Sequence, residues 1–78
     1  MYELETFTAR GERLVIRTDA ALTEGNLRIL LLCDGEYVTD IPLGAQTTAV
    51  ENPDGRFELR LAAESAKMQM TYTIEVTE

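Results

Sequence analysis

Hydrophobic and polar residues alternate along most of this chain, and the alternation is clearest near its C-terminal end. Residues 67–77 read KMQMTYTIEVT and residues 56–62 read RFELRLA, so every second side chain in each segment is apolar. Because successive side chains of a strand point to opposite faces, this pattern predicts strands with one face on a core and the other in water. Residues 13–18 show the same pattern, with Leu14 and Ile16 on the apolar face.

Short turn sequences separate the apolar segments. Asp34-Gly35 is typical of a two-residue hairpin turn. Residues 52–55, NPDG, fit a type I turn because proline and glycine occupy positions that such a turn favours. Residues 20–26, AALTEGN, are expected to form a loop with a helical turn that ends at Gly25. Strands are therefore predicted near residues 2–9, 13–18, 27–33, 36–42, 47–51, 56–62 and 68–76.

The fold predicted from these strands is all-β: a small antiparallel two-sheet β-sandwich of about seven short strands, in a single domain over residues 1–78. No long helical pattern interrupts the strands. In the first strand the alternation changes phase between Leu4 and Phe7. We therefore expect a β-bulge near Glu5-Thr6, or a strand that crosses from one sheet to the other.

The stretch 27–43, LRILLLCDGEYVTDIPL, differs from the other segments because its first arm is apolar on both faces. Leu30 and Leu32 lie on the face opposite the predicted core. Two explanations are open: the predicted loop at 19–26 covers this second face, or the face is an exposed apolar patch that binds protein. In the second case the partner is another protein or a second copy, paired as a homodimer through this hairpin. The candidate interface then consists of Leu30, Leu32, Tyr37 and Val38.

The charge balance argues against a nucleic-acid partner. Fourteen acidic residues stand against seven basic ones, which gives a formal net charge of −7 over 78 residues. A nucleic-acid binder needs a surplus of Lys and Arg, so no nucleic-acid partner is expected.

No apolar run approaches the length of a membrane-spanning helix, so no membrane insertion is expected. A single cysteine, Cys33, leaves no pair for an internal disulfide.

The residue types also argue against catalysis. The chain has no histidine, and no base near Cys33 is evident that would activate its thiol. The acid pairs along the chain are typical of solvated strand faces and turns: Glu3 with Glu5, Asp34 with Glu36, and Glu51 with Asp54. Asp19 and Glu24 share a predicted loop, and Asp34, Glu36 and Asp54 lie near predicted loop ends where oxygen ligands could gather, but no calcium-binding spacing motif occurs. We therefore predict that the protein is not an enzyme and has no catalytic, cofactor or metal site.

Residues 53–76, PDGRFELRLAAESAKMQMTYTIEV, combine a turn glycine, an aromatic-led alternating strand, a polar turn and a last strand of the kind Tyr-x-Ile-x-Val. This segment resembles the closing strands of small jelly-roll or immunoglobulin-like accessory domains of the pre-peptidase C-terminal type. Residues 22–38 would correspond to an earlier hairpin of that fold. The hairpin of the family typically begins with an acidic Asp-x-Asp-Leu sequence, which LRILLL replaces in this chain. The match is carried by Gly55, Phe57, Leu59, Leu61, Tyr72, Ile74 and Val76.

The resemblance implies a non-catalytic accessory module, usually extracytoplasmic and attached to a larger protein. The sequence thus predicts a binding module of a bacterial extracytoplasmic or cell-envelope protein that acts through protein–protein contact, with any leader encoded upstream of Met1. The alternative is a stand-alone acidic inhibitor, for example phage-encoded, that blocks a basic host protein. Small size, the net charge and outward acids such as Glu3, Glu58 and Glu75 motivate this alternative.

Overall fold

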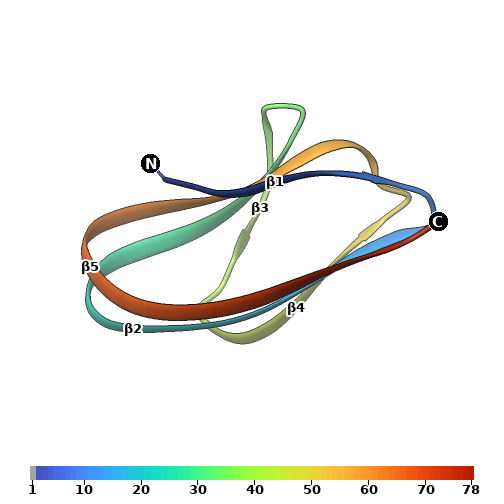
Figure 1. The fold of residues 1–78 in the computed structure, drawn as a ribbon. Coiled ribbons are helices and arrows are strands. Elements are labelled where there is room, and N and C mark those ends of the chain that lie inside the picture. The colour runs from blue at the N-terminus through green and yellow to red at the C-terminus, as the bar shows by residue number, and fades with distance from the viewer. Residues whose placement is uncertain (1) are drawn as a thin grey trace.

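Two long antiparallel strands dominate the computed structural model, which describes residues 2–78 (Figure 1). They are β2 (Arg13–Cys33) and β5 (Asp54–Thr77), and they pair from Arg13 opposite Thr77 to Cys33 opposite Phe57. Their alternating patterns match across this ladder, so the apolar side chains of both strands share one face. The remaining strands are β1 (Tyr2–Arg10), β3 (Glu36–Ile41) and β4 (Gly44–Glu51).

The three short strands add to different parts of the long ladder. β1 pairs with the first part of β5, from Tyr2 opposite Leu61 to Arg10 opposite Asp54. On the other side of the ladder, β4 pairs with the beginning of β2 and β3 pairs with its end. The result is one strongly curled five-stranded sheet, a half-barrel, in the order β1-β5-β2-β3 with β4 also on β2.

The curl comes from a bend near the middle of both long strands. The β2–β5 register shifts twice there, between Leu22 and Glu24 and between Glu24 and Asn26. Gly25 on β2 has a φ of 84° and Ser65 on β5 has a φ of 50°. A Cβ atom on Gly25 would lie 2.3 Å from the backbone oxygen of Ser65, so only glycine fits at this point. The bulges let the ladder continue while its two halves turn toward each other.

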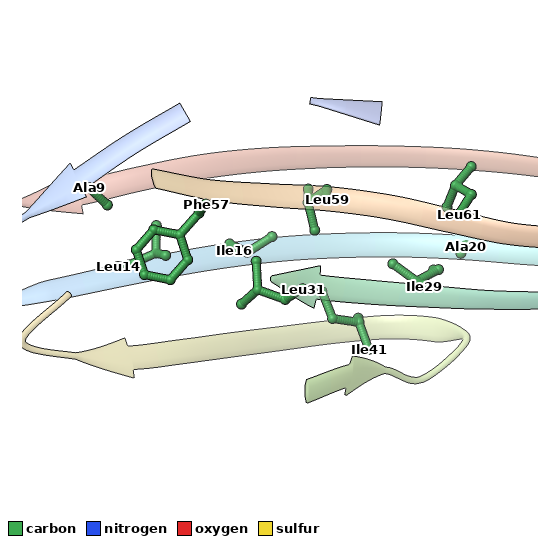
Figure 2. Close-up of a cluster of buried hydrophobic side chains, with 10 residues drawn as sticks. All are labelled: Ala9, Leu14, Ile16, Ala20, Ile29, Leu31, Ile41, Phe57, Leu59 and Leu61. Carbon is green, nitrogen blue, oxygen red and sulfur yellow. The ribbon is translucent and has the colours of Figure 1, made fainter. Parts of the chain in front are cut away.

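The hydrophobic core lies between the two halves of the curled sheet (Figure 2). Its side chains come from the concave face of every strand except β4. Phe7 stacks on Phe57 with 5.8 Å between ring centroids, which joins β1 to the core. The buried cluster consists of Ala9, Leu14, Ile16, Ala20, Ile29, Leu31, Ile41, Phe57, Leu59 and Leu61.

The predicted two-sheet sandwich of seven short strands is wrong. The predicted segments match parts of the five observed strands, but residues 19–26 and 63–67 continue β2 and β5 instead of interrupting them. No helical turn forms at 20–26. The error has a physical cause: at the bend most side chains point into water, so a bulged strand there has the polar, glycine-containing composition of a loop.

Two local predictions hold in the structure. The first strand contains a β-bulge, which lies between Glu3 and Glu5 and thus slightly before the predicted position. The hairpin turn of 27–43 is formed by Asp34 and Gly35, with φ values of 51° and 82°. Positive φ at both positions defines a type I′ turn, whose twist matches that of the flanking strands. The hairpin therefore has the register that its sequence predicts near the turn, with Cys33 opposite Glu36.

Candidate functional site

The four residues of the predicted interface differ widely in exposure. Leu30 is only 6% exposed and Leu32 is half-buried, whereas Tyr37 is 60% and Val38 is 41% exposed. Leu32 lies directly opposite Tyr37, and Leu30 lies opposite Asp40. A register shift between Leu31 and Leu32 accommodates Val38 in β3. The structure thus brings Leu32 and Tyr37 together, and most of the exposed apolar surface belongs to Tyr37 and Val38.

Charged neighbours explain why Leu30 is buried although it lies outside the core cluster. The register places Arg60 of β5 on one side of Leu30 and Asp40 of β3 on the other. Arg28 binds Asp40 at 2.9 Å, and Arg60 binds Glu58 at 2.6 Å. The aliphatic stems of long charged side chains cover apolar surface while their charged ends stay in water. Of the two explanations that the sequence left open, cover by a loop at 19–26 is wrong, because that segment is part of β2.

Arg28, Tyr37 and Asp40 form a connected cluster on the outer face of the hairpin. Arg28 donates two hydrogen bonds to the Asp40 carboxylate, from Nε at 3.0 Å and from Nη2 at 2.9 Å. Tyr37 donates its hydroxyl to Oδ1 of the same carboxylate at 2.6 Å. Hydrogen bonds from Arg28 and then Tyr37 lower the pKa of Asp40, and the bond to Asp40 raises the pKa of Tyr37. An exposed aromatic ring is therefore fixed in one orientation.

An open hollow of about 690 Å³ adjoins this cluster at the bend of the long strands. Most of its wall is apolar, and Arg28 forms part of the polar remainder. Leu43 contributes from the corner between β3 and β4, where its side chain is 39% exposed. We call it the bend hollow; its lining residues are Leu22, Asn26, Leu27, Arg28, Leu43, Ala62, Ala63 and Glu64.

Sequence reasoning missed the bend hollow. Its lining combines β2, β5 and the β3–β4 corner, which only the bend brings together. One signal was present: Leu43 is an apolar residue between Pro42 and Gly44, in a turn where polar residues are usual. The bulge in β3 shifts the register of the hairpin so that Asp40 lies opposite Leu30. Asp40 is therefore diagonal to Arg28 on the same face, within reach of its guanidinium.

Cys33 is half-buried beside the hairpin turn and is poorly suited to nucleophilic chemistry. Burial first, and then the neighbouring Asp34 carboxylate, raise the pKa of its thiol. Asp34 fastens the turn to β5, because Oδ1 accepts a hydrogen bond from the Arg56 amide at 3.1 Å. A Cβ on Gly55 would lie 2.6 Å from Asp34 Oδ2 and 2.9 Å from the Cys33 sulfur. The close packing of these residues therefore supports a structural role for Cys33 and Asp34.

The acidic residues that could bind calcium are spread over the sheet. Asp19 and Glu24 lie in β2, and Asp34 and Asp54 lie at strand ends. Within residues 2–78, no group of three or more Asp, Glu, Cys or His side chains is arranged to hold a metal ion. Asp54 pairs instead with Arg10 at 3.2 Å, and Glu24 pairs with Lys67 at 3.3 Å.

No protein-family model, curated protein or solved structure matches the chain. The similarity to pre-peptidase C-terminal accessory domains therefore stays a prediction from the sequence pattern. Among residues 2–78, no helix is long and apolar enough to cross a membrane.

Proposed function

We propose that this protein is a non-catalytic module that binds another protein through the hairpin surface, defined here as the bend hollow together with Arg28, Tyr37 and Asp40. One observation carries the proposal: an exposed tyrosine donates to a carboxylate that is ion-paired with Arg28, and Arg28 itself lines an apolar hollow. Tyrosine and arginine are the residues most often found at the energetic centres of protein interfaces.

The hydrogen bonds of the cluster make this surface suitable for binding. A tyrosine that is already fixed loses little conformational freedom when a partner packs against it, so more of the contact energy appears as affinity. The bend hollow supplies the second element of a typical interface, a concave apolar site that accepts one anchoring side chain. The partner segment is expected to carry an apolar anchor such as leucine or phenylalanine.

The charge distribution indicates which residues should flank that anchor. Six of the seven basic side chains are ion-paired with acids, so the net charge of −7 comes from acids in excess of these pairs. Glu64 lies at the bend hollow itself. A partner segment with basic residues beside its apolar anchor is therefore favoured electrostatically. An envelope accessory module and an acidic inhibitor would both use such a contact.

A peptide-display selection tests the proposal without a known partner. Random twelve-residue peptides are selected on the immobilised protein, and the affinity of the enriched peptides is then measured against variants. We expect enriched peptides with an apolar residue flanked by Lys or Arg. Tyr37→Ala and Leu43→Glu should each weaken their binding by at least about tenfold, because both substitutions remove a part of the anchoring surface.

Tyr2→Ala is the matched control, because Tyr2 is 64% exposed and Tyr37 is 60% exposed. Tyr2 lies on β1, which pairs with neither β2 nor β3, and it does not line the bend hollow, so its replacement should leave affinity unchanged. Peptides that respond to Tyr2→Ala as strongly as to Tyr37→Ala would contradict the proposal. Peptides that bind the Tyr37→Ala and Leu43→Glu variants at full affinity would contradict it as well.

A further inference from the structure

The second half of β5 has an unpaired edge. β1 pairs with β5 only as far as Leu61, and beyond this residue β5 pairs with β2 on one side alone. No strand within residues 2–78 pairs with the other side of residues 62–77. This edge is longer than β1, β3 or β4, and β-edges of this kind are sites where further strands add.

The backbone groups at this edge can be assigned from two hydrogen bonds on the opposite side of the strand. Thr77 O accepts from the Glu12 amide at 2.8 Å, and Lys67 O accepts from the Thr23 hydroxyl at 3.1 Å. Odd-numbered residues of this half therefore direct their N–H and C=O groups toward β2. In an antiparallel ladder the alternate residues direct theirs the other way, so residues 68, 70, 72, 74 and 76 present theirs at the unpaired edge.

The same alternate residues carry the apolar side chains of this half, and these side chains are incompletely covered. Val76 is 38% exposed although its cross-strand neighbour Leu14 is fully buried. Ile74 is half-buried beside the fully buried Ile16. None of the ten core residues drawn in Figure 2 comes from residues 62–77. The apolar face of the sheet thus extends to the unpaired edge, where its side chains are partly exposed to solvent.

The edges of β1 and β3 carry features that discourage pairing, and β4, which pairs with β2 alone, is only eight residues long. β1 contains the bulge between Glu3 and Glu5, and Pro42 follows the short β3 directly. Residues 68–77 contain neither a proline nor a register shift. Bulges, prolines and short length are the means by which proteins protect exposed edges, so this segment is comparatively open to pairing.

We propose that a second copy of this chain binds here, with β5 paired antiparallel to β5 around a twofold axis at Thr71. In this register Thr71 lies opposite itself and Met70 lies opposite Tyr72. Lys67 of each copy lies opposite Glu75 of the other, so the two charged residues of the ladder form complementary pairs at both ends. A shift by two residues would still align the apolar faces, but it would lose both charge pairs.

Charge complementarity is the reason for choosing this partner and this register. Each copy carries a net charge of −7, so two copies repel each other unless the contact region is locally balanced. Lys67 and Glu75 already pair with Glu24 and Arg17 within one chain, at 3.3 Å and 3.1 Å. All four side chains are largely exposed, so the new pairs would extend these into networks across the twofold axis.

A disulfide at the axis tests the register directly. In the proposed ladder, residue 71 forms a non-hydrogen-bonded pair with its symmetry mate, with about 4.5 Å between Cα atoms. This separation lies within the range that a disulfide spans. We therefore expect Thr71→Cys, in a Cys33→Ala background, to form a covalent dimer rapidly under mild oxidation.

Thr73→Cys in the same background is the matched control. Thr73 would lie opposite Gln69, which separates the two copies of residue 73 by about 13 Å along the ladder, too far for a disulfide. We expect Thr71→Cys to cross-link at least about tenfold faster than Thr73→Cys. Equal rates would overturn the proposed ladder.

Sedimentation of the unmodified protein provides the second measurement. The average mass should rise from monomer toward dimer between about 10 µM and 1 mM, as expected for a contact near the lower limit of interface size. A monomer throughout this range would overturn the proposal. Neither measurement involves the hairpin surface, so its outcome is independent of the proposed function.

Discussion

The two halves of the β2–β5 ladder have the same sequence pattern but different burial. In the half nearer the hairpin turn, both members of a cross-strand pair are buried, as in Leu31 opposite Leu59. In the half nearer the termini, the β2 member is buried and the β5 member is not, as in Leu14 opposite Val76. One half is a closed core and the other is a core with an open side.

Neighbouring strands cause this difference. The first part of β5 has β1 along its second edge, and Phe7 stacks there on Phe57. The second part of β5 pairs with β2 alone, and β1 reaches it through the hydrogen bond that Tyr72 donates to Glu5 at 3.4 Å (Figure 1). Alternation in sequence therefore shows which face of a strand is apolar, whereas the topology decides how completely that face is covered.

The largest expected effect compares one residue from each half. Leu59→Ala removes a fully buried side chain in the closed half and should cost about 3 kcal/mol of unfolding free energy. Ile74→Ala removes a half-buried side chain in the open half and should cost about half as much. Urea denaturation of both variants measures the two losses. Equal losses would contradict the description of one half as open.

The bend between the halves should be nearly as sensitive. Gly25→Ala places a Cβ against the Ser65 carbonyl at a positive φ, and should cost roughly 3 kcal/mol. Gly35→Ala is the control, because it has a positive φ but no atom within 4 Å of the added Cβ. That substitution should cost about 1–2 kcal/mol. Thermal denaturation that shows the reverse order would rule out the close contact at the bend.

Thr18 offers a substitution that should stabilise the open half. Its side chain is buried opposite Tyr72, and within residues 2–78 its hydroxyl has no hydrogen-bond partner. Thr18→Val keeps the β-branched shape and removes the unsatisfied polar group, which should raise the unfolding free energy by about 1 kcal/mol. Chemical denaturation of both proteins tests this gain. A loss of stability would show that the hydroxyl has a partner in solution.

The smallest effect concerns the outer face of the closed half. Arg28 and Tyr37 lower the pKa of Asp40 in the folded protein, so the carboxylate stabilises the fold above its ordinary titration range. This contribution is lost as the pH falls through the lowered pKa. Asp40→Asn should therefore be less stable than the parent at pH 7, and the difference should shrink below about pH 4. A difference independent of pH would contradict the proposed charge pairing.

The sequence was sufficient to predict the all-β class and the strand faces, because both depend on local alternation. Leu14, Ile16, Phe57, Leu59 and Leu61 are buried as that alternation predicts. The type I′ turn was also predictable, since Asp34-Gly35 is a strong local signal. These features depend on residues close together in the chain.

The continuity of the long strands was not predictable in the same way. A bulged bend that exposes its side chains has the composition of a loop, and only cross-strand pairs such as Glu24 with Lys67 and Asn26 with Glu64 distinguish the two. The burial of Leu30 was not predictable from local sequence either, because it depends on Asp40 and Arg60 from two other strands. The bend hollow depends on the same long-range arrangement.

The most direct test of this account is a nuclear Overhauser measurement of the distances between Hα protons across the bend. A continuous β2–β5 ladder predicts strong contacts between Leu22 and Met68 on one side of the bend and between Leu27 and Ala63 on the other. Both contacts should match the intensity of the Ile16–Ile74 contact. Their absence, with the Ile16–Ile74 contact intact, would show that the long strands are interrupted and would contradict the single curled sheet.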